Sequence, residues 1–149
     1  MELVLFLGIQ ATGKSTFYKQ RYADTHIRLN LDMLRTRHRE TILLNACLAA
    51  KQPCVIDNTN PTKLERARYI EAAQQNNFSV KGLFFASGIE AALSRNQSRP
   101  KDKIIPELAI RGTRNRLETP DYGEGFDRLH YVTTTESGDF SVVEWESDI

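Results

Sequence analysis

The stretch that decides the fold is GIQATGKST, residues 8–16, which directly follows the apolar run ELVLFL. Gly8, Gly13, Lys14 and Ser15 have the spacing of a phosphate-binding loop: glycine, four residues, glycine, lysine, then serine or threonine. Such a loop joins a buried strand to a helix, and it directs backbone N–H groups and the positive end of the helix dipole at one point. We therefore predict a P-loop that binds nucleotide phosphates, rather than a chance match at an ordinary strand–helix turn.

Each position of this loop has a predicted task. Gly8 and Gly13 permit unusual backbone angles and a close approach of the backbone to phosphate. The ammonium group of Lys14 can reach the β- and γ-phosphate oxygens, and the hydroxyl of Ser15 can ligate Mg²⁺. The loop residues predicted to bind ATP are Gly8, Ala11, Thr12, Gly13, Lys14, Ser15 and Thr16.

Strand and helix patterns alternate along the rest of the chain. Strand patterns cover residues 2–7, 26–30, 54–57, 78–85, 128–134 and 140–146, and helix patterns cover residues 14–22, 31–51, 61–75, 87–96 and 106–117. This alternation predicts an α/β fold of the P-loop NTPase type, with a doubly wound, mainly parallel sheet and helices on both faces. The last two strands are expected to form an antiparallel edge. Asn60 and Ser87 are the expected caps of the helices that follow them.

Length and composition are those of an ordinary globular protein, and we expect residues 1–149 to form one domain. No apolar run approaches the ~20 residues that span a bilayer, and the amino terminus lacks the basic lead of a secretion signal. The only two cysteines, Cys47 and Cys54, have no metal-binding spacing and are expected to be reduced, partly buried thiols. These features predict a cytoplasmic protein without a membrane partner.

The formal net charge of +1 hides a strong asymmetry along the chain. Residues 94–116 carry a net charge of +5, whereas residues 117–149 carry −8. The basic run falls where a phosphate-handling lid is expected, and it includes Arg95 and Arg99, one helical turn apart before Pro100. Arginines on a lid can neutralise the charge of a phosphoryl group in transfer. From spacing alone, both arginines can equally be solvated surface residues.

Two aspartates are candidates for chemistry at the carboxyl edge of the sheet, where α/β folds bind ligands. Asp57 closes the strand CVID, where P-loop folds place an acid beside the metal, and Asn60 is available as the helix cap in its place. Asp32 follows the strand HIRLN and can serve as the base that takes a proton from the acceptor. Arg35 lies one helical turn after it. The alternative is that Asp32 only stabilises the start of its helix and Arg35 is solvated.

Together these segments resemble the 5′-hydroxyl polynucleotide kinase domain of phage and animal end-healing enzymes. Four blocks carry the resemblance: GIQATGKST, LNLDMLR from residue 29, IDNTNPTKLERARYIEAA from residue 56, and SRNQSRP with the later ELAIRGTRNRLETPDYGEGF. They span most of the chain, from about residue 3 to residue 126. The loop interior departs from the family, because Ile9 to Thr12 lack the Pro-Gly-Ser usually found there.

The resemblance implies transfer of the ATP γ-phosphate to a 5′-OH end of DNA or RNA, with Mg²⁺. It places Asp32 on the general base, and Arg35 on an arginine that engages this base and a phosphate of the acceptor. Asp57 falls on the acid of the DTN-type motif, a metal-site position, while Arg95 and Arg99 fall on lid arginines that hold the ATP phosphates. The residues expected to be catalytic are Asp32, Lys14 and Arg99.

Two other functions remain open from the sequence. A small-molecule kinase for a sugar, a metabolite or an antibiotic also uses an aspartate at a strand end as the base. A nucleotide-dependent switch needs the P-loop, but it does not need Asp32 and Arg35, and the chain has no Asn-Lys-x-Asp guanine motif. As a polynucleotide kinase the chain is expected to be a monomer or a weak homo-oligomer, with separate ligase or phosphatase proteins as partners.

Overall fold

The computed structural model describes residues 1–86, 88–135 and 137–146 and is built around one six-stranded sheet. The strands lie in the order β2 (Ile27–Leu29), β3 (Cys54–Ile56), β1 (Glu2–Leu7), β4 (Ser79–Phe85), β5 (Arg128–Thr134) and β6 (Phe140–Glu144). The first five strands of this order are parallel, and β6 pairs with β5 in the antiparallel direction. The structure therefore confirms both the mainly parallel sheet and its antiparallel edge.

Strand β1 lies at the centre of the sheet because its sequence is apolar on both faces. Leu3 pairs with Cys54 of β3 on one side and with Val80 of β4 on the other, and all three side chains are buried. Parallel strands that are covered on both faces read as continuous apolar runs, as ELVLFL does. Helices therefore have to cover both faces of this sheet.

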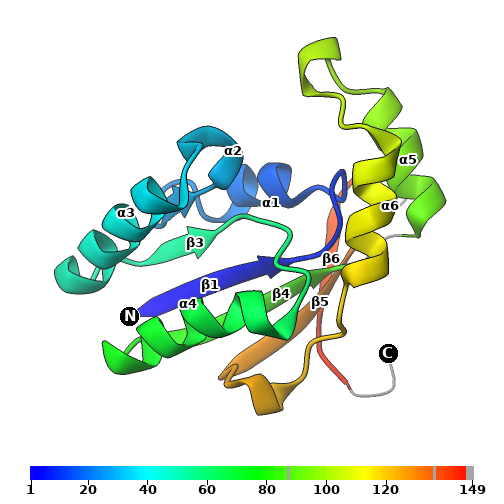
Figure 1. Cartoon of the computed structure of the whole chain (residues 1–149). Helices are drawn as coiled ribbons and strands as arrows, with labels where there is room; N and C mark the ends of the chain where they lie inside the picture. The colour runs from blue at the N-terminus through cyan, green and yellow to red at the C-terminus, as the bar shows by residue number, and fades with distance from the viewer. Residues whose placement is uncertain (87, 136, 147–149) are drawn as a thin grey trace.

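The helices are arranged in that way (Figure 1). They are α1 (Lys14–Arg21), α2 (Leu31–Leu34), α3 (Arg37–Ala50), α4 (Lys63–Gln75), α5 (Ile89–Gln97) and α6 (Glu107–Arg116), with single 3₁₀ turns η1 (Lys101–Lys103) and η2 (Tyr122–Glu124). Leu48 of α3 and Tyr69 of α4 pack in the core on one face of the sheet. Phe17 of α1 packs against Phe6 and Phe85 on the other face. The doubly wound prediction is confirmed.

Two local predictions are wrong. The helix expected over residues 31–51 is broken, because Arg35 has a φ of 76° and the Thr36 side chain caps a new helix by accepting from the N–H of Arg39. Asn60 does not cap a helix: its side chain donates to the carbonyl of Phe6, and Thr62 caps α4 instead. Ser87, the cap expected for α5, lies outside the described residues.

The carboxyl ends of β1, β2 and β3 meet at one edge of the sheet, and the P-loop, α2 and residues 57–60 begin there. The chain runs from β1 to β2 on one side and later to β4 on the other, which makes this edge a topological switch point. Among the residues that the structure describes, no helix has the length and apolar composition needed to cross a membrane.

Candidate active site

The P-loop has the backbone conformation that its glycines were expected to permit. Gly8 has a φ of 138°, and an added Cβ would lie 2.5 Å from the carbonyl oxygen of Phe85. Gly13 has a φ of 93°, and an added Cβ would lie 2.9 Å from the ring of Phe140. Ala11 also has a positive φ, 61°, in a region that glycine adopts more readily than alanine. The loop therefore requires glycine at positions 8 and 13, and it holds Ala11 under backbone strain.

Lys14 folds back over this loop and is buried. Its Nζ donates to the carbonyl of Gly8 at 2.8 Å, to the carbonyl of Ile9, and to Oγ1 of Thr12 at 3.3 Å. Burial lowers the pKa of Lys14 to about 8, although the charge of Asp57 opposes this shift. The ammonium group therefore lies in an environment that disfavours its charge, and an anion bound beside it would offset that cost.

Lys14 and three other predicted residues come together at this ammonium group. Besides Asp57, the charge of Arg99 lowers the pKa of Lys14, and the charge of Asp32 raises it. These side chains come from the P-loop, α2, the end of β3 and the lid (residues 97–105). Charges act on a pKa mainly at short range, so each of the three charged groups lies near Lys14.

Two further features fit this edge to phosphate. Helix α1 begins at Gly13 without a hydrogen bond from a capping side chain, so the N–H groups of its first turn remain available. Nη1 of Arg99 is buried and has no hydrogen-bond acceptor within the described part of the chain. A buried guanidinium nitrogen without an acceptor is costly, and a phosphate oxygen supplies an acceptor of the matching charge.

The buried Lys14 leads to a prediction about stability. We expect Lys14→Met to be more stable than the wild type at pH 7, by up to about 3 kcal/mol, because the pKa falls from 10.5 to about 8 and one pKa unit corresponds to about 1.4 kcal/mol. The pKa of Lys14 in the folded protein, about 8, lies below its ordinary value of 10.5, so the unfolded chain binds more protons between these two pH values. The wild type should therefore gain stability relative to the variant as pH rises from 8 to 10.5, and the difference should shrink.

Urea unfolding at pH 7 and at pH 10 measures this difference. Lys19→Met, which removes an exposed lysine from the same helix, is the matched control and should leave stability nearly unchanged. A Lys14→Met protein that is less stable than the wild type at pH 7 would contradict the claim that burial of the Lys14 ammonium group destabilises the folded protein.

The two oxygens expected to hold a metal lie together. Oγ of Ser15 donates to Oδ2 of Asp57 at 3.1 Å, and Asp57 is buried. Arg28 of β2 donates from Nε to the same oxygen of Asp57 at 2.8 Å, and from Nη2 to Oγ of Ser15 at 2.9 Å. A hydroxyl and a carboxylate are hard donors of the kind Mg²⁺ prefers, and Mg²⁺ commonly takes only one or two protein ligands beside substrate phosphates. The pair fits Mg²⁺ in that role.

Within the described residues, no cluster of three or more His, Cys, Asp or Glu side chains could hold a metal by itself. A metal bound at Ser15 and Asp57 would therefore depend on phosphate oxygens for further ligands. This dependence matches a metal that arrives with a nucleotide.

Asp32 lies exposed in the first turn of α2, and two asparagines position that turn. Oδ1 of Asn30 caps α2 by accepting from the N–H of Met33, and its Nδ2 donates to the carbonyl of Asp57 at 2.6 Å. Oδ1 of Asn58 accepts from the N–H of Leu31 at 3.0 Å. Asp32 is therefore held near Asp57 by contacts between the ends of β2 and β3, and it is not the cap of its own helix.

Asp32 and Arg35 do not form an ion pair within the described residues. Arg35 follows the last residue of α2, with a positive φ and an exposed side chain. The helical turn that was expected to place both side chains on one face ends before Arg35. Arg35 instead lies at the sharp bend between α2 and α3.

A buried acid behind this turn was missed from the sequence. Glu40 of α3 is 2% exposed and accepts from the hydroxyl of Tyr69 at 2.8 Å and from Arg37 at 3.1 Å. Its second oxygen accepts from Nδ2 of Asn58 at 3.1 Å, and Asn58 in turn holds the start of α2. Burial raises the pKa of Tyr69 to about 12, with the charge of Glu40 as the second cause. The network fixes α3 and α4 against the turn that carries Asp32.

The base of the lid is closed by another residue that the sequence did not single out. Asn96 of α5 is buried, and it both donates to the carbonyl of Ile105 at 2.6 Å and accepts from its N–H at 2.9 Å. These two bonds close the chain around residues 97–104. Ile9 of the P-loop packs with Ala92 of α5 and Ile110 of α6. Ile9 is one of the loop residues that depart from the family pattern, and it holds these two helices, which flank the lid, against the loop.

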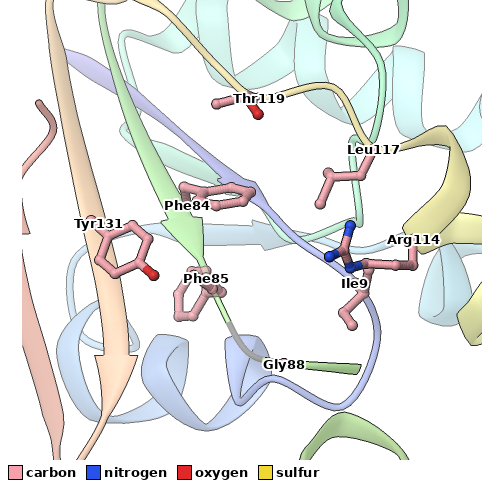
Figure 2. Close-up of a pocket in the computed structure, with 9 residues that line it drawn as sticks. Ile9, Phe84, Phe85, Gly88, Arg114, Leu117, Thr119 and Tyr131 are labelled. Atoms are coloured by element: carbon pink, nitrogen blue, oxygen red, sulfur yellow. The ribbon is translucent and has the colours of Figure 1, made fainter. Parts of the chain in front are cut away.

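A groove of about 390 Å³ lies beside the P-loop, at the carboxyl end of β4 and next to Tyr131 in the middle of β5 (Figure 2). Its lining residues include Ile9, Phe84, Tyr131, Arg114 and Leu117. None of the predicted catalytic, metal-binding or acceptor-binding residues lines it. The groove is therefore distinct from the phosphate and metal edge around Lys14.

Comparison with known proteins agrees with this fold. The model of a family described as AAA domain matches residues 3–120, so the chain belongs to this family, whose P-loop the structure shows at residues 8–16. The chain is 30% identical, over 135 residues, to a bifunctional polynucleotide phosphatase/kinase of Schizosaccharomyces pombe. That match covers 88% of this chain and 33% of the relative, so the chain spans about a third of the relative's length.

Solved structures share the fold at low sequence identity. Kti12 from Chaetomium thermophilum, solved with ADP-AlF3, superposes with a TM-score of 0.68 at 18% identity, and the match covers 91% of this chain and 92% of that one. A gluconokinase from Sinorhizobium meliloti superposes with a TM-score of 0.62 at 16% identity, and the match covers 89% and 82% of the two chains. The chain thus has a nucleotide-binding P-loop fold and resembles polynucleotide kinases in sequence.

Proposed function

We propose that this protein is an ATP-dependent kinase that transfers the γ-phosphate to a 5′-hydroxyl end of a polynucleotide. One observation carries the proposal: beside the P-loop, Ser15 and Asp57 are hydrogen-bonded to each other, and Asn30 ties the turn that carries Asp32 to the carbonyl of Asp57. A nucleotide switch needs only the P-loop and the metal pair. The presence of a second, exposed carboxylate at the same edge favours transfer to an acceptor that has to lose a proton.

In this proposal each side chain has one task. Asp32 accepts the proton of the 5′-hydroxyl, and the hydroxyl oxygen forms a bond to the γ-phosphorus while the bond from that phosphorus to the leaving oxygen of ADP breaks. Lys14 and Arg99 donate to phosphate oxygens and stabilise the charge that develops on them. Ser15 and Asp57 would hold Mg²⁺, with Asp57 acting through a bound water. At these two side chains Mg²⁺ would supply positive charge that offsets the charge of the phosphate groups.

The choice of a polynucleotide as acceptor is supported by the curated relative, whose name is polynucleotide phosphatase/kinase. Arg35 supports it as well, because an exposed guanidinium three residues after Asp32 can reach a phosphate of the acceptor strand. The alternative is a small-molecule kinase, and the fold shared with a gluconokinase favours it. A 5′ end requires few phosphate contacts, so the near-neutral charge of the chain is compatible with either acceptor.

An acceptor panel tests the proposal. Purified protein, Mg²⁺ and ATP labelled in the γ-phosphate are offered a 5′-OH oligonucleotide, the same oligonucleotide with a 5′-phosphate, and small alcohols that include gluconate. We expect label on the 5′-OH oligonucleotide and none on its phosphorylated form. Label on a small alcohol, with the oligonucleotide left unlabelled, would replace this proposal with the small-molecule kinase.

A further inference from the structure

Arg28 occupies an unusual position for a strand residue, because its guanidinium group donates to both side chains of the proposed metal site. Nε and Nη2 donate to Asp57 and to Ser15 at 2.8 and 2.9 Å, and the Ser15 hydroxyl donates to the same carboxylate oxygen. A carboxylate oxygen has about two acceptor positions, and on Oδ2 of Asp57 both are used. Three side chains from β2, α1 and the end of β3 thus form a closed hydrogen-bonded triangle.

The triangle already supplies what a metal ion would supply. Asp57 is 2% exposed, and a buried carboxylate requires a cation beside it. Arg28 provides that cation from a side chain that is itself 25% exposed. A divalent metal that ligates Ser15 and interacts with Asp57 would have to place its charge next to this guanidinium group, and like charges at that separation disfavour each other.

We propose that Arg28 competes with the divalent metal for Ser15 and Asp57, and so sets the metal affinity of the site. In the metal-free protein its guanidinium group orients the two oxygens and neutralises Asp57. When metal binds, Nη2 has to withdraw from the Ser15 hydroxyl, and the partly exposed side chain can turn toward solvent. The ring of Tyr18, whose centroid lies 5.9 Å from the guanidinium carbon, provides a surface along which this cation can remain.

This competition has a consequence for the order of binding. A bare metal ion has to displace Arg28 with only Ser15 as a direct protein ligand and with Asp57 acting through a bound water, whereas a metal that arrives with nucleotide phosphates brings further ligands and negative charge. Arg28 therefore selects for the metal–nucleotide complex over the free ion. The inference rests on the proposed function only in taking Ser15 and Asp57 as the metal-binding pair.

The test is the affinity of Mn²⁺, used as the probe, for the protein saturated with ADP, measured by electron paramagnetic resonance without any acceptor. Arg28→Met should bind Mn²⁺ more tightly than the wild type, on the order of tenfold, since removal of a like charge at this range changes the affinity for a cation by about that factor. Arg21→Met is the matched control, because it removes an arginine from the exposed surface of α1 and should change the affinity less than twofold. Arg28→Lys keeps the charge but cannot bridge both oxygens, and it should bind Mn²⁺ with an affinity between those of the wild type and Arg28→Met.

The outcomes separate this inference from the proposed function. Equal or weaker Mn²⁺ binding by Arg28→Met would overturn the competition and make Arg28 a residue that supports the metal site. If Arg28→Met does not fold, Arg28→Lys becomes the test. A Mn²⁺ affinity of Arg28→Lys that is no tighter than that of the wild type would then overturn the inference. Asp57→Asn should weaken Mn²⁺ binding; an unchanged affinity would remove Asp57 from the metal site, and the inference would fall with it. Acceptor specificity affects none of these measurements.

Discussion

Asp32→Asn is expected to lower kinase turnover by ~10²–10⁴, the range for loss of a general base, while ATP affinity stays nearly unchanged. Asparagine keeps the size and the shape of the side chain but cannot accept the proton of the hydroxyl. The nucleotide contacts are expected on Lys14, Ser15 and the lid, so they do not involve this carboxylate.

The structure sharpens this prediction. An aspartate that only capped its helix would tolerate asparagine, but the cap of α2 is Asn30, whose side chain accepts from the N–H of Met33. Asp32 is exposed and faces the same edge as Lys14, whose pKa it raises. The change should therefore leave the fold intact and act on the chemistry alone.

Turnover with a 5′-OH oligonucleotide, ATP affinity and the unfolding midpoint are measured for Asp32→Asn. Asp24→Asn, an exposed aspartate in the turn after α1, is the matched control and should behave as the wild type. Turnover of Asp32→Asn within about threefold of the wild type, far below the general-base range, would remove Asp32 from the reaction.

The second large effect is expected at Arg99. Arg99→Ala should lose on the order of 10³-fold in turnover, because a positioned cation that faces the transferring phosphoryl group is worth about that much. Nη1 of Arg99 is buried without an acceptor in the described structure, and its charge reaches Lys14. Both observations place the guanidinium group toward the phosphate edge.

Lys103→Ala is the matched control for the lid, since Lys103 is an exposed cation of η1 a few residues further along the chain. It should keep turnover within about threefold of the wild type, because an exposed charge is screened by solvent. Similar losses in Arg99→Ala and Lys103→Ala would reduce the lid to a general positive field without a positioned residue.

The fold was predictable because periodicity and loop chemistry agreed along most of the chain. The apolar run before Gly8 became β1 with the expected bounds, and Arg128–Thr134 became β5. The break between α2 and α3 was not predictable in the same way, because apolar residues keep a helical spacing across Arg35 while the backbone turns there. The spacing of apolar side chains indicates which residues are buried, but it does not indicate a positive φ at one residue.

The predicted catalytic residues came from motifs, whereas the residues that hold them in place did not. Asn58, Glu40 and Asn96 act through hydrogen bonds to segments distant in the chain or to backbone groups. The type of a single residue does not indicate which partner it will bind. Arg28 was missed for the same reason, since its partners Ser15 and Asp57 lie 13 and 29 residues away. Its place on the strand just before Asp32 was the one available indication.

The position of the transferred phosphate tests the central claim most directly. A 5′-OH oligonucleotide is incubated with the protein, Mg²⁺ and ATP labelled in the γ-phosphate, and the product is digested to mononucleotides. The proposed reaction predicts that all label is recovered in the 5′-monophosphate of the first nucleotide. Two results would contradict the assignment of this protein as a polynucleotide 5′-hydroxyl kinase. The label is released only as inorganic phosphate, or it appears on an acceptor other than the 5′ end.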